Sequence, residues 1–140
     1  GINGKNSAFN AALGLCVLKH ADDILLDRNR IWNAYKSTLK TLHVQLLCIN
    51  PDGKFNYSYF PVVFKTEDAL LKSIDLLNKN HIFPRRYFSP SLNNLNYVEH
   101  RDCPVSESIS KRILCLPVYH NITQEEIDMV SRLLLRAQNH

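Results

Sequence analysis

Apolar side chains recur every three or four residues over the first third of the chain, which is the repeat of an amphipathic helix. Ser7 stands just before this pattern, where its hydroxyl can accept a hydrogen bond from a free amide of the first turn. The pattern predicts two consecutive helices, or one long bent helix, ending near Leu42. Its apolar members are Phe9, Ala12, Leu13, Cys16 and Leu18, followed by Ile24, Ile31, Tyr35, Leu39 and Leu42.

Two short apolar segments after this helical region predict an antiparallel strand pair. Residues 44–49 and 57–64 are rich in β-branched, aliphatic and aromatic side chains. The sequence Asn-Pro-Asp-Gly at residues 50–53, a strong turn signal, lies between them. Residues 67–80 then return to helical spacing with charges between the apolar positions, which predicts a surface helix covering the sheet.

The second half of the chain predicts two further strands and two further helices. Residues 82–88 are a strand candidate in which Pro84 requires an edge or a bulge, and the aperiodic residues 89–103 predict a binding loop. Pro104 suits the first turn of a helix ending at Arg112, and residues 113–118 predict a buried strand. Thr123 and Glu126 form a capping box that opens the last helix.

The order of these elements predicts an α+β fold. We expect a small, mainly antiparallel sheet of three to four strands with packed helices, preceded by a long helix. Residues 1–42 would form a linking helical region, and residues 43–140 would form the α+β sheet domain.

Composition is that of an ordinary globular domain. The 140 residues are 45% hydrophobic and 21% charged, and a domain of this size that docks on another can leave one face apolar. The net charge of +4 is scattered, which argues against a nucleic-acid site but suits a site that receives a diphosphate. The apolar runs are far too short to span a bilayer and no signal peptide opens the chain, so we expect a cytoplasmic protein.

The four cysteines predict neither disulfides nor a metal site. Cys16, Cys48 and Cys115 sit inside apolar stretches, which favours buried, reduced thiols. Zinc sites need closely spaced ligand pairs, and the four cysteines and six histidines do not supply them.

Two segments carry polar residues that the fold does not need. Residues 1–7 form a glycine-containing loop that leads into a helix N-terminus, where Asn3 and Lys5 could bind an anionic phosphate. Arg85, Arg86 and Tyr87 could pair with phosphate and stack on a base or sugar, although strand alternation sends the two arginines to opposite faces. The alternatives are an ordinary capped loop and a solvated arginine pair. The chain carries no Gly-rich phosphate loop and no G-x-S-x-G or H-E-x-x-H motif, so it looks poor as a stand-alone enzyme.

The order of several short motifs resembles the C-terminal part of the DegT/DnrJ/EryC1/StrS aminotransferase family. Residues 1–7 look like its G-x-N-x-[RK]-x-[ST] loop, and residues 11–15 look like its A-A-x-G-L helix. Residues 27–35 fall where the family has its R-R and Y helix pattern. Further similar segments are His81 to Pro90 (family G-I-x-x-R-x-Y-x-P), residues 103–107 (C-P-x-[AS]-E), residues 114–119 (L-x-L-P-x-[YH]) and residues 122–127 (L-T-x-E-E-I).

This resemblance implies a pyridoxal 5'-phosphate (PLP) enzyme of fold type I. Such an enzyme is a homodimer that moves an amino group from glutamate to its nucleotide-sugar substrate, which is a keto-sugar nucleotide. The product serves surface polysaccharide (O-antigen) or deoxyaminosugar biosynthesis. The Arg-Arg-Tyr-Phe-Ser-Pro form resembles members that act on dTDP-4-keto-6-deoxyglucose. The chain would be the C-terminal small domain without the large PLP-lysine domain, and it would be inactive alone. The alternative is a stand-alone α+β ligand-binding or dimerisation module.

The resemblance also implies roles for particular residues. Asn3 and Lys5 match the family positions that bind the cofactor phosphate, and Arg86 and Tyr87 fall at positions that face the substrate. The resemblance implies that the Schiff-base lysine lies outside this chain, so we assign no catalytic residue here. We assign no metal ligand either. His81 replaces the glycine of the family's G-I pair.

Overall fold

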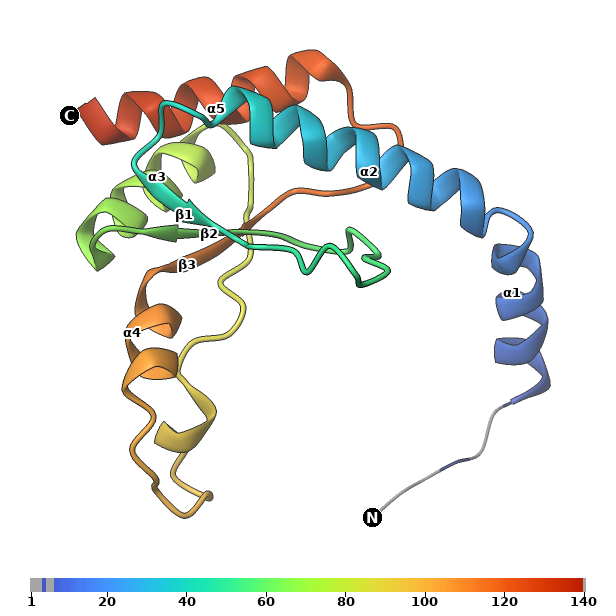
Figure 1. Cartoon of the computed structure of the whole chain (residues 1–140), viewed down its shortest axis with the longest axis horizontal. Coiled ribbons are helices and arrows are strands. Elements are labelled where there is room, and N and C mark those ends of the chain that lie inside the picture. Colours follow the sequence, from blue (N-terminus) through green and yellow to red (C-terminus); the bar gives the residue numbers. More distant parts are fainter. Residues whose placement is uncertain (1–3, 5–6, 140) are drawn as a thin grey trace.

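The chain opens with two consecutive helices, as the apolar spacing predicts. The computed structural model describes Gly4 and residues 7–139. Helix α1 spans Ala8–Leu18 and helix α2 spans Ala21–Thr38, so the helical region ends a few residues before Leu42. The cap is confirmed, because the amide of Asn10 donates to Ser7 Oγ at 3.1 Å. Figure 1 shows that α1 bends away from the N-terminal end of α2 and stands apart from the sheet.

A three-stranded antiparallel sheet forms the centre of the molecule. Strands β1 (Val44–Leu46), β2 (Phe60–Phe64) and β3 (Ile113–Leu116) lie in the order β1-β2-β3. Val44 pairs with Phe64, and Phe60 pairs with Leu116, which fixes the register of both ladders. The predicted strand pair and the α+β class are confirmed.

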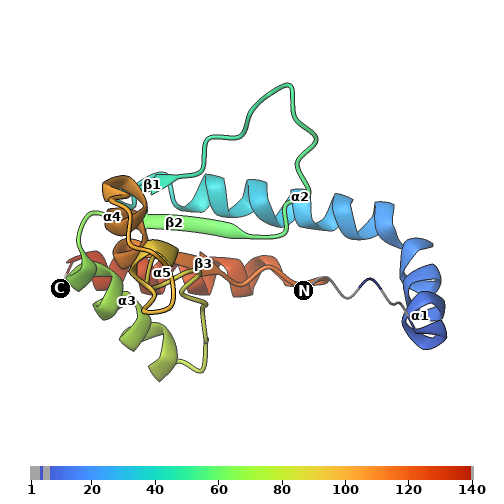
Figure 2. The ribbon, with the colours of Figure 1, turned by 90° about the horizontal axis from the view of Figure 1, so that it is seen from below.

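Three more helices complete the fold. Helix α3 spans Glu67–Lys79, α4 spans Pro104–Arg112 and α5 spans Gln124–Asn139, and a short 3-10 turn, η1, covers Leu92–Asn94. The predicted capping box opens α5: the Thr123 amide donates to Glu126 Oε2 at 2.8 Å, and the Glu126 amide donates to Thr123 Oγ1 at 3.2 Å. Helices α2 and α5 cover one face of the sheet, and Figure 2 views the molecule from the other face. No helix within the described residues is both long and apolar enough to cross a bilayer.

The core lies between the sheet and the helices α2, α3 and α5. Alternate residues of β2 point into it, because Phe60, Val62 and Phe64 are buried while Pro61 and Val63 are half-buried. The Phe60 ring packs against Trp32 and Tyr35 of α2, with centroid separations of 4.7 and 5.1 Å. Helix α2 therefore belongs to the core of the sheet domain, and the division of the chain at residue 42 stays a prediction. The helices contribute Ile31, Trp32, Tyr35, Leu70, Leu77, Ile127, Val130 and Leu134.

The strand predicted for residues 82–88 forms only one isolated bridge. Arg85 pairs with Cys115 of β3, donating to its carbonyl at 3.2 Å and accepting from its amide at 2.8 Å. Pro84 has no amide to extend the ladder, and the Tyr87 amide turns back to the Arg85 carbonyl at 3.2 Å. The sheet therefore has three strands and a single bridged position at its β3 edge.

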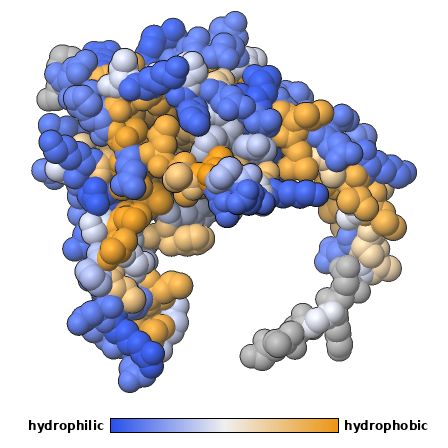
Figure 3. All heavy atoms as spheres, in the orientation of Figure 1, coloured by the Kyte–Doolittle hydropathy of each residue, from blue (hydrophilic) through white to orange (hydrophobic). Residues whose placement is uncertain are grey.

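The prediction of buried thiols was wrong for two of the three cysteines. Cys115 is buried in β3, whereas Cys16 and Cys48 are exposed. Cys16 lies on α1, which has no buried residue despite its apolar sequence. Apolar spacing indicated a packed face there, but within the described residues no element covers the helix, and Figure 3 shows hydrophobic atoms on its surface. Its exposed large apolar residues are Phe9, Leu13, Leu15, Val17 and Leu18.

His81 adopts the left-handed conformation that the family's glycine would favour. Its φ is +61°, and the Ile82 amide donates back to the Leu77 carbonyl at 3.0 Å to close helix α3. A side chain strains this conformation, so His81→Gly should raise the free energy of unfolding by about 1 kcal/mol.

Urea denaturation of the His81→Gly variant and of the parent chain measures the change in the free energy of unfolding. Asn80→Gly is the matched control, because Asn80 has a φ of −104° and its amide side chain donates to the Leu76 carbonyl at 2.8 Å. That variant should be destabilised, and an unchanged or lowered stability of His81→Gly would contradict the strain.

Candidate functional site

A cleft of about 460 Å³ lies where helix α2, the segment before β2, the bridged segment at Arg85 and the end of β3 meet. It contains two arginines, three tyrosines and a serine, and no carboxylate lies among the described residues that line it. Arginine side chains without a carboxylate partner favour an anionic ligand. The polar residues of this cleft are Arg28, Ser58, Tyr59, Arg85, Tyr87 and Tyr119.

The backbone bridge to β3 positions Arg85 and Tyr87 in this cleft. Residues two apart in an extended segment point to the same side, so both side chains follow from the pairing of Arg85 with Cys115. Arg85 Nη1 donates to the Tyr87 hydroxyl at 2.5 Å, and the guanidinium carbon lies 5.6 Å from the centre of the Tyr87 ring. The Tyr59 ring meets the Tyr87 ring edge-on, with centroids 5.4 Å apart. These contacts form an aromatic wall beside a guanidinium group.

Arg28 brings a second guanidinium to the cleft from helix α2. It is half-buried, and its Nη1 lies 3.5 Å from Ser58 Oγ, at the outer limit of a hydrogen bond. Among the described residues neither Arg28 nor Arg85 forms an ion pair with a carboxylate, whereas Arg30, Arg86 and Arg101 each do. Within the described chain, neither guanidinium of the cleft is therefore paired directly with a carboxylate.

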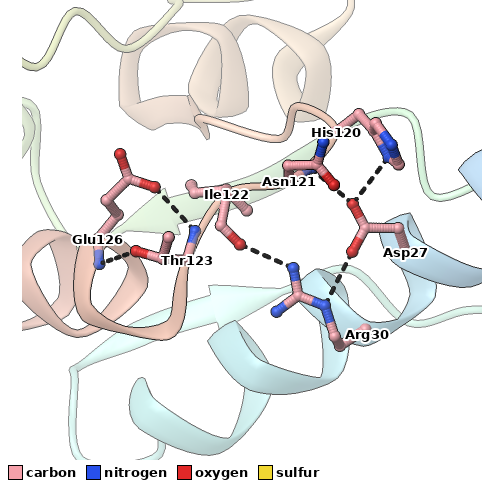
Figure 4. A network of polar contacts seen from close by, with 7 residues as sticks. All are labelled: Asp27, Arg30, His120, Asn121, Ile122, Thr123 and Glu126. Atoms are coloured by element: carbon pink, nitrogen blue, oxygen red, sulfur yellow. Dashed lines mark hydrogen bonds and ion pairs between the residues drawn. The ribbon is translucent and has the colours of Figure 1, made fainter.

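A network around Asp27 holds the turn of α2 that carries Arg28. Asp27 Oδ2 accepts from the Asn121 amide at 2.8 Å and lies 3.1 Å from His120 Nδ1, and Oδ1 accepts from Arg30 Nε at 2.8 Å (Figure 4). Arg30 also donates to the Ile122 carbonyl at 2.7 Å. The Asn121 amide is the main cause that lowers the pKa of Asp27, with Arg30 and His120 acting in the same direction and burial opposing them.

Tyr35 makes a second tie between α2 and the wall of the cleft. Its buried hydroxyl donates to the Pro117 carbonyl at 3.1 Å, and burial raises the pKa of the phenol. Pro117 lines the cleft. The cleft walls that α2 and the end of β3 contribute are thus fixed to each other by Tyr35 and by the Asp27 network.

Of the two residues predicted to face the substrate, only Tyr87 lies in this cleft. Arg86 points away from it: its Nη2 lies 3.2 Å from Glu67 Oε1 of α3 and donates to the Lys111 carbonyl of α4 at 3.1 Å. The expectation that Arg85 and Arg86 face opposite ways therefore holds, and Arg85 is the arginine beside Tyr87. A substrate contact for Arg86 stays a prediction, one that this ion pair does not favour.

The remaining predicted site residues lie outside the described part of the chain or apart from this cleft. Asn3 and Lys5 fall outside the described residues. The predicted loop at residues 89–103 is tied to α4, because Glu107 Oε1 accepts from the Cys103 amide at 3.0 Å and from Asn93 Nδ2 at 2.6 Å. The Cys103 amide is the main cause that lowers the pKa of Glu107. Among the described residues no group of three or more histidine, cysteine or acidic side chains could hold a metal ion.

Arg28 was not among the site residues predicted from the sequence, and Arg86 rather than Arg85 was predicted to contact the substrate. A signal for Arg85 was present, because residues 85 and 87 share a face of an extended segment. Arg28 lies in the helical pattern of α2, where an arginine is ordinarily a surface residue, and only the tertiary structure brings it to Ser58.

Comparison with known proteins links the whole chain to one family of enzymes. The profile of the DegT/DnrJ/EryC1/StrS aminotransferase family matches residues 1–134. The dTDP-4-amino-4,6-dideoxy-D-glucose transaminase of Escherichia coli is 35% identical over 146 residues, which cover 96% of this chain and 39% of the relative. The enzyme of the same name from Shigella dysenteriae is 31% identical, with 93% and 37% covered.

Solved structures agree with this link. DesI, crystallised in the presence of its TDP-sugar product, superposes with a TM-score of 0.84 at 27% identity and covers 98% of this chain and 37% of its own. A DegT DnrJ EryC1 StrS aminotransferase from Brucella abortus shares the fold, with a TM-score of 0.84 at 23% identity over 97% of this chain and 37% of its own. The chain spans about two-fifths of the length of the curated relatives it matches. It belongs to the DegT/DnrJ/EryC1/StrS aminotransferase family.

Proposed function

We propose that this chain is part of a PLP-dependent aminotransferase that moves an amino group from glutamate to a keto-sugar nucleotide. The observation that carries the proposal is the 35% identity, over 96% of the chain, to a dTDP-4-amino-4,6-dideoxy-D-glucose transaminase. We infer that the acceptor is dTDP-4-keto-6-deoxyglucose. The proposal includes a cytoplasmic homodimer that serves surface polysaccharide (O-antigen) or deoxyaminosugar biosynthesis.

The cleft supports a substrate-binding role for this part of the protein. Arg28 and Arg85, which contact no carboxylate among the described residues, suit the negatively charged part of the substrate. The Tyr87 hydroxyl, which accepts from Arg85, can orient the sugar. The rings of Tyr59 and Tyr87 exclude water from one side of the bound ligand. Binding and orientation of the nucleotide sugar are the steps that we assign to these residues.

The described residues fit the substrate end of a PLP site but not the attachment of the cofactor. PLP, when bound, accepts the amino group from one substrate and gives it to the other. Its attachment needs a lysine within a pocket, and every described lysine is exposed, with none lining the cleft that holds Tyr87. Lys5 lies outside the described residues, and the family resemblance gives it another role. We therefore propose that the Schiff-base lysine lies outside residues 1–140. Asn3 and Lys5 are proposed to contact the cofactor phosphate.

We propose a matching division of the chain. Residues 1–140 would form the small domain, in which residues 1–42 are the helical region that links to the part of the enzyme that holds PLP and residues 43–140 are the α+β sheet domain. Helix α2 of the linking region also packs on the sheet. The uncovered apolar surface of α1 supports this arrangement, because such a surface favours contact with another folded unit.

The test is transamination by the natural gene product, expressed with whatever the gene encodes upstream of Gly1. Supplied with PLP, glutamate and dTDP-4-keto-6-deoxyglucose, it should form 2-oxoglutarate and an amino-sugar nucleotide that mass spectrometry detects. Tyr87→Phe should lower kcat/KM about tenfold, the effect of losing one hydrogen bond of about 1.4 kcal/mol. Arg101→Gln, an exposed position outside the cleft, should leave the rate unchanged. Failure to convert any keto-sugar nucleotide would contradict the proposed function.

A further inference from the structure

We propose that Arg28 and Arg85 together form the subsite for the diphosphate of the nucleotide sugar, an inference that rests on the proposed function. Both arginines line one cleft, and they reach it from separate elements. Arg28 belongs to α2, and Arg85 is held at the free edge of β3 by its two backbone hydrogen bonds to Cys115. A ligand that spans the cleft can therefore meet a guanidinium group from each of these elements.

The charges of the cleft argue for an anionic ligand. No described carboxylate lies within 4 Å of Arg28 or Arg85 or lines the cleft, whereas the neighbouring Arg30 and Arg86 each form an ion pair outside it. The present partners of the two cleft arginines are neutral hydroxyl groups on Ser58 and Tyr87. A phosphate oxygen carries a negative charge and can pair with a guanidinium through two parallel hydrogen bonds, so it can displace both hydroxyls.

The aromatic wall argues for a nucleotide rather than a small dicarboxylate. Two guanidinium groups alone would also suit the two carboxylates of glutamate. The Tyr87 ring beside Arg85, the Tyr59 ring that meets it and the exposed ring of Phe83, however, also line this cleft. A base or sugar ring attached to a diphosphate can pack on these rings, whereas glutamate has no ring to place against them.

The backbone of Arg28 is held in place before any ligand arrives. The residue before it, Asp27, binds the Asn121 amide, and Arg30 binds the Ile122 carbonyl, so this turn of α2 is fixed to the loop before α5 (Figure 4). By contrast, the single hydrogen bond of the Arg28 side chain to any described residue is the 3.5 Å contact to Ser58. A fixed backbone with a weakly bound guanidinium lowers the cost of binding an anion.

The experiment measures dTDP affinity by calorimetry, using the natural gene product and its Arg28→Gln and Arg85→Gln variants. Each substitution should raise the Kd for dTDP about tenfold, and the double variant should raise it further, because each removes a charged hydrogen bond. Binding of thymidine, which has the base and sugar but no phosphate, should change less than twofold. The Arg28→Lys and Arg85→Lys variants keep the charge and should lose less affinity than the Gln variants. Arg101→Gln is the control for a removed exposed arginine.

Several outcomes would overturn the subsite. An unchanged dTDP affinity in the double variant would do so, and so would an equal loss of thymidine and dTDP affinity, which would indicate a structural effect. A loss of glutamate affinity alone would assign the two arginines to the amino donor instead. The subsite can fail while transamination persists, and dTDP binding can depend on both arginines in a protein that transaminates no sugar. The two proposals are therefore tested separately.

Discussion

Phe60→Ala should lower the free energy of unfolding by about 4 kcal/mol, because it empties the centre of the core. Phe60 is fully buried in β2, and its ring lies 4.7 Å from that of Trp32 and 5.1 Å from that of Tyr35. The cavity would separate α2 from the sheet and remove two aromatic contacts. Urea denaturation followed by Trp32 fluorescence measures the loss, since Trp32 is the single tryptophan of the chain.

Phe83→Ala is the matched control for this prediction. It removes the same side chain from a position that is 71% exposed, so the free energy of unfolding should change by less than about 0.5 kcal/mol. Equal effects of the two substitutions would show that the Phe60 ring does not hold α2 on the sheet.

Asp27→Ala should lower the free energy of unfolding by about 2 kcal/mol at neutral pH, the range expected for hydrogen bonds to a charged group. The carboxylate joins α2 to the loop before α5 through the Asn121 amide, Arg30 and His120. Its removal leaves the Asn121 amide without this acceptor. Urea denaturation of the variant and of the parent chain at pH 7 measures the difference.

The same substitution predicts a pH dependence with a definite sign. Folding lowers the pKa of Asp27 below its ordinary value of 3.8, so the folded state favours the charged carboxylate. Its contribution is complete above pH 3.8 and is lost as the pH falls through the lowered pKa of the folded state. The stabilities of parent and Asp27→Ala should therefore converge in acid. A difference that persists or grows below that range would contradict this assignment.

Helices and their ends could be predicted from the sequence because local chemistry decides them. Ser7, Pro104 and the Thr123–Glu126 box mark helix starts that the structure confirms. The pairing of residues 82–88, where the predicted strand forms only one bridge, could not be predicted in the same way. These residues have strand-like character, but their pairing depends on which amides and carbonyls β3 presents, and only Arg85 meets them.

The candidate site depends even more on tertiary structure. Alternation along the chain separates Arg85 from Arg86, but it does not say which of the two faces a cleft. The backbone bridge between Arg85 and Cys115 of β3 decides this, and Arg86, on the opposite side, pairs with Glu67 of α3. Arg28 joins the site through the packing of α2 on the sheet, which no local pattern reports. The exposed apolar surface of α1 shows the same limit, since apolar spacing does not reveal what a helix packs against.

The walls of the cleft come from parts of the chain that are far apart in sequence: α2, the residues before β2, the segment around Arg85 and the end of β3. Unfolding disperses them, so we expect only the native state to bind the proposed nucleotide ligand. By mass action, dTDP at a hundred times its Kd should therefore add about 2.7 kcal/mol to the stability of the native state. The melting temperature should rise with dTDP concentration, which makes a thermal-shift titration a screen for the natural ligand that needs no turnover.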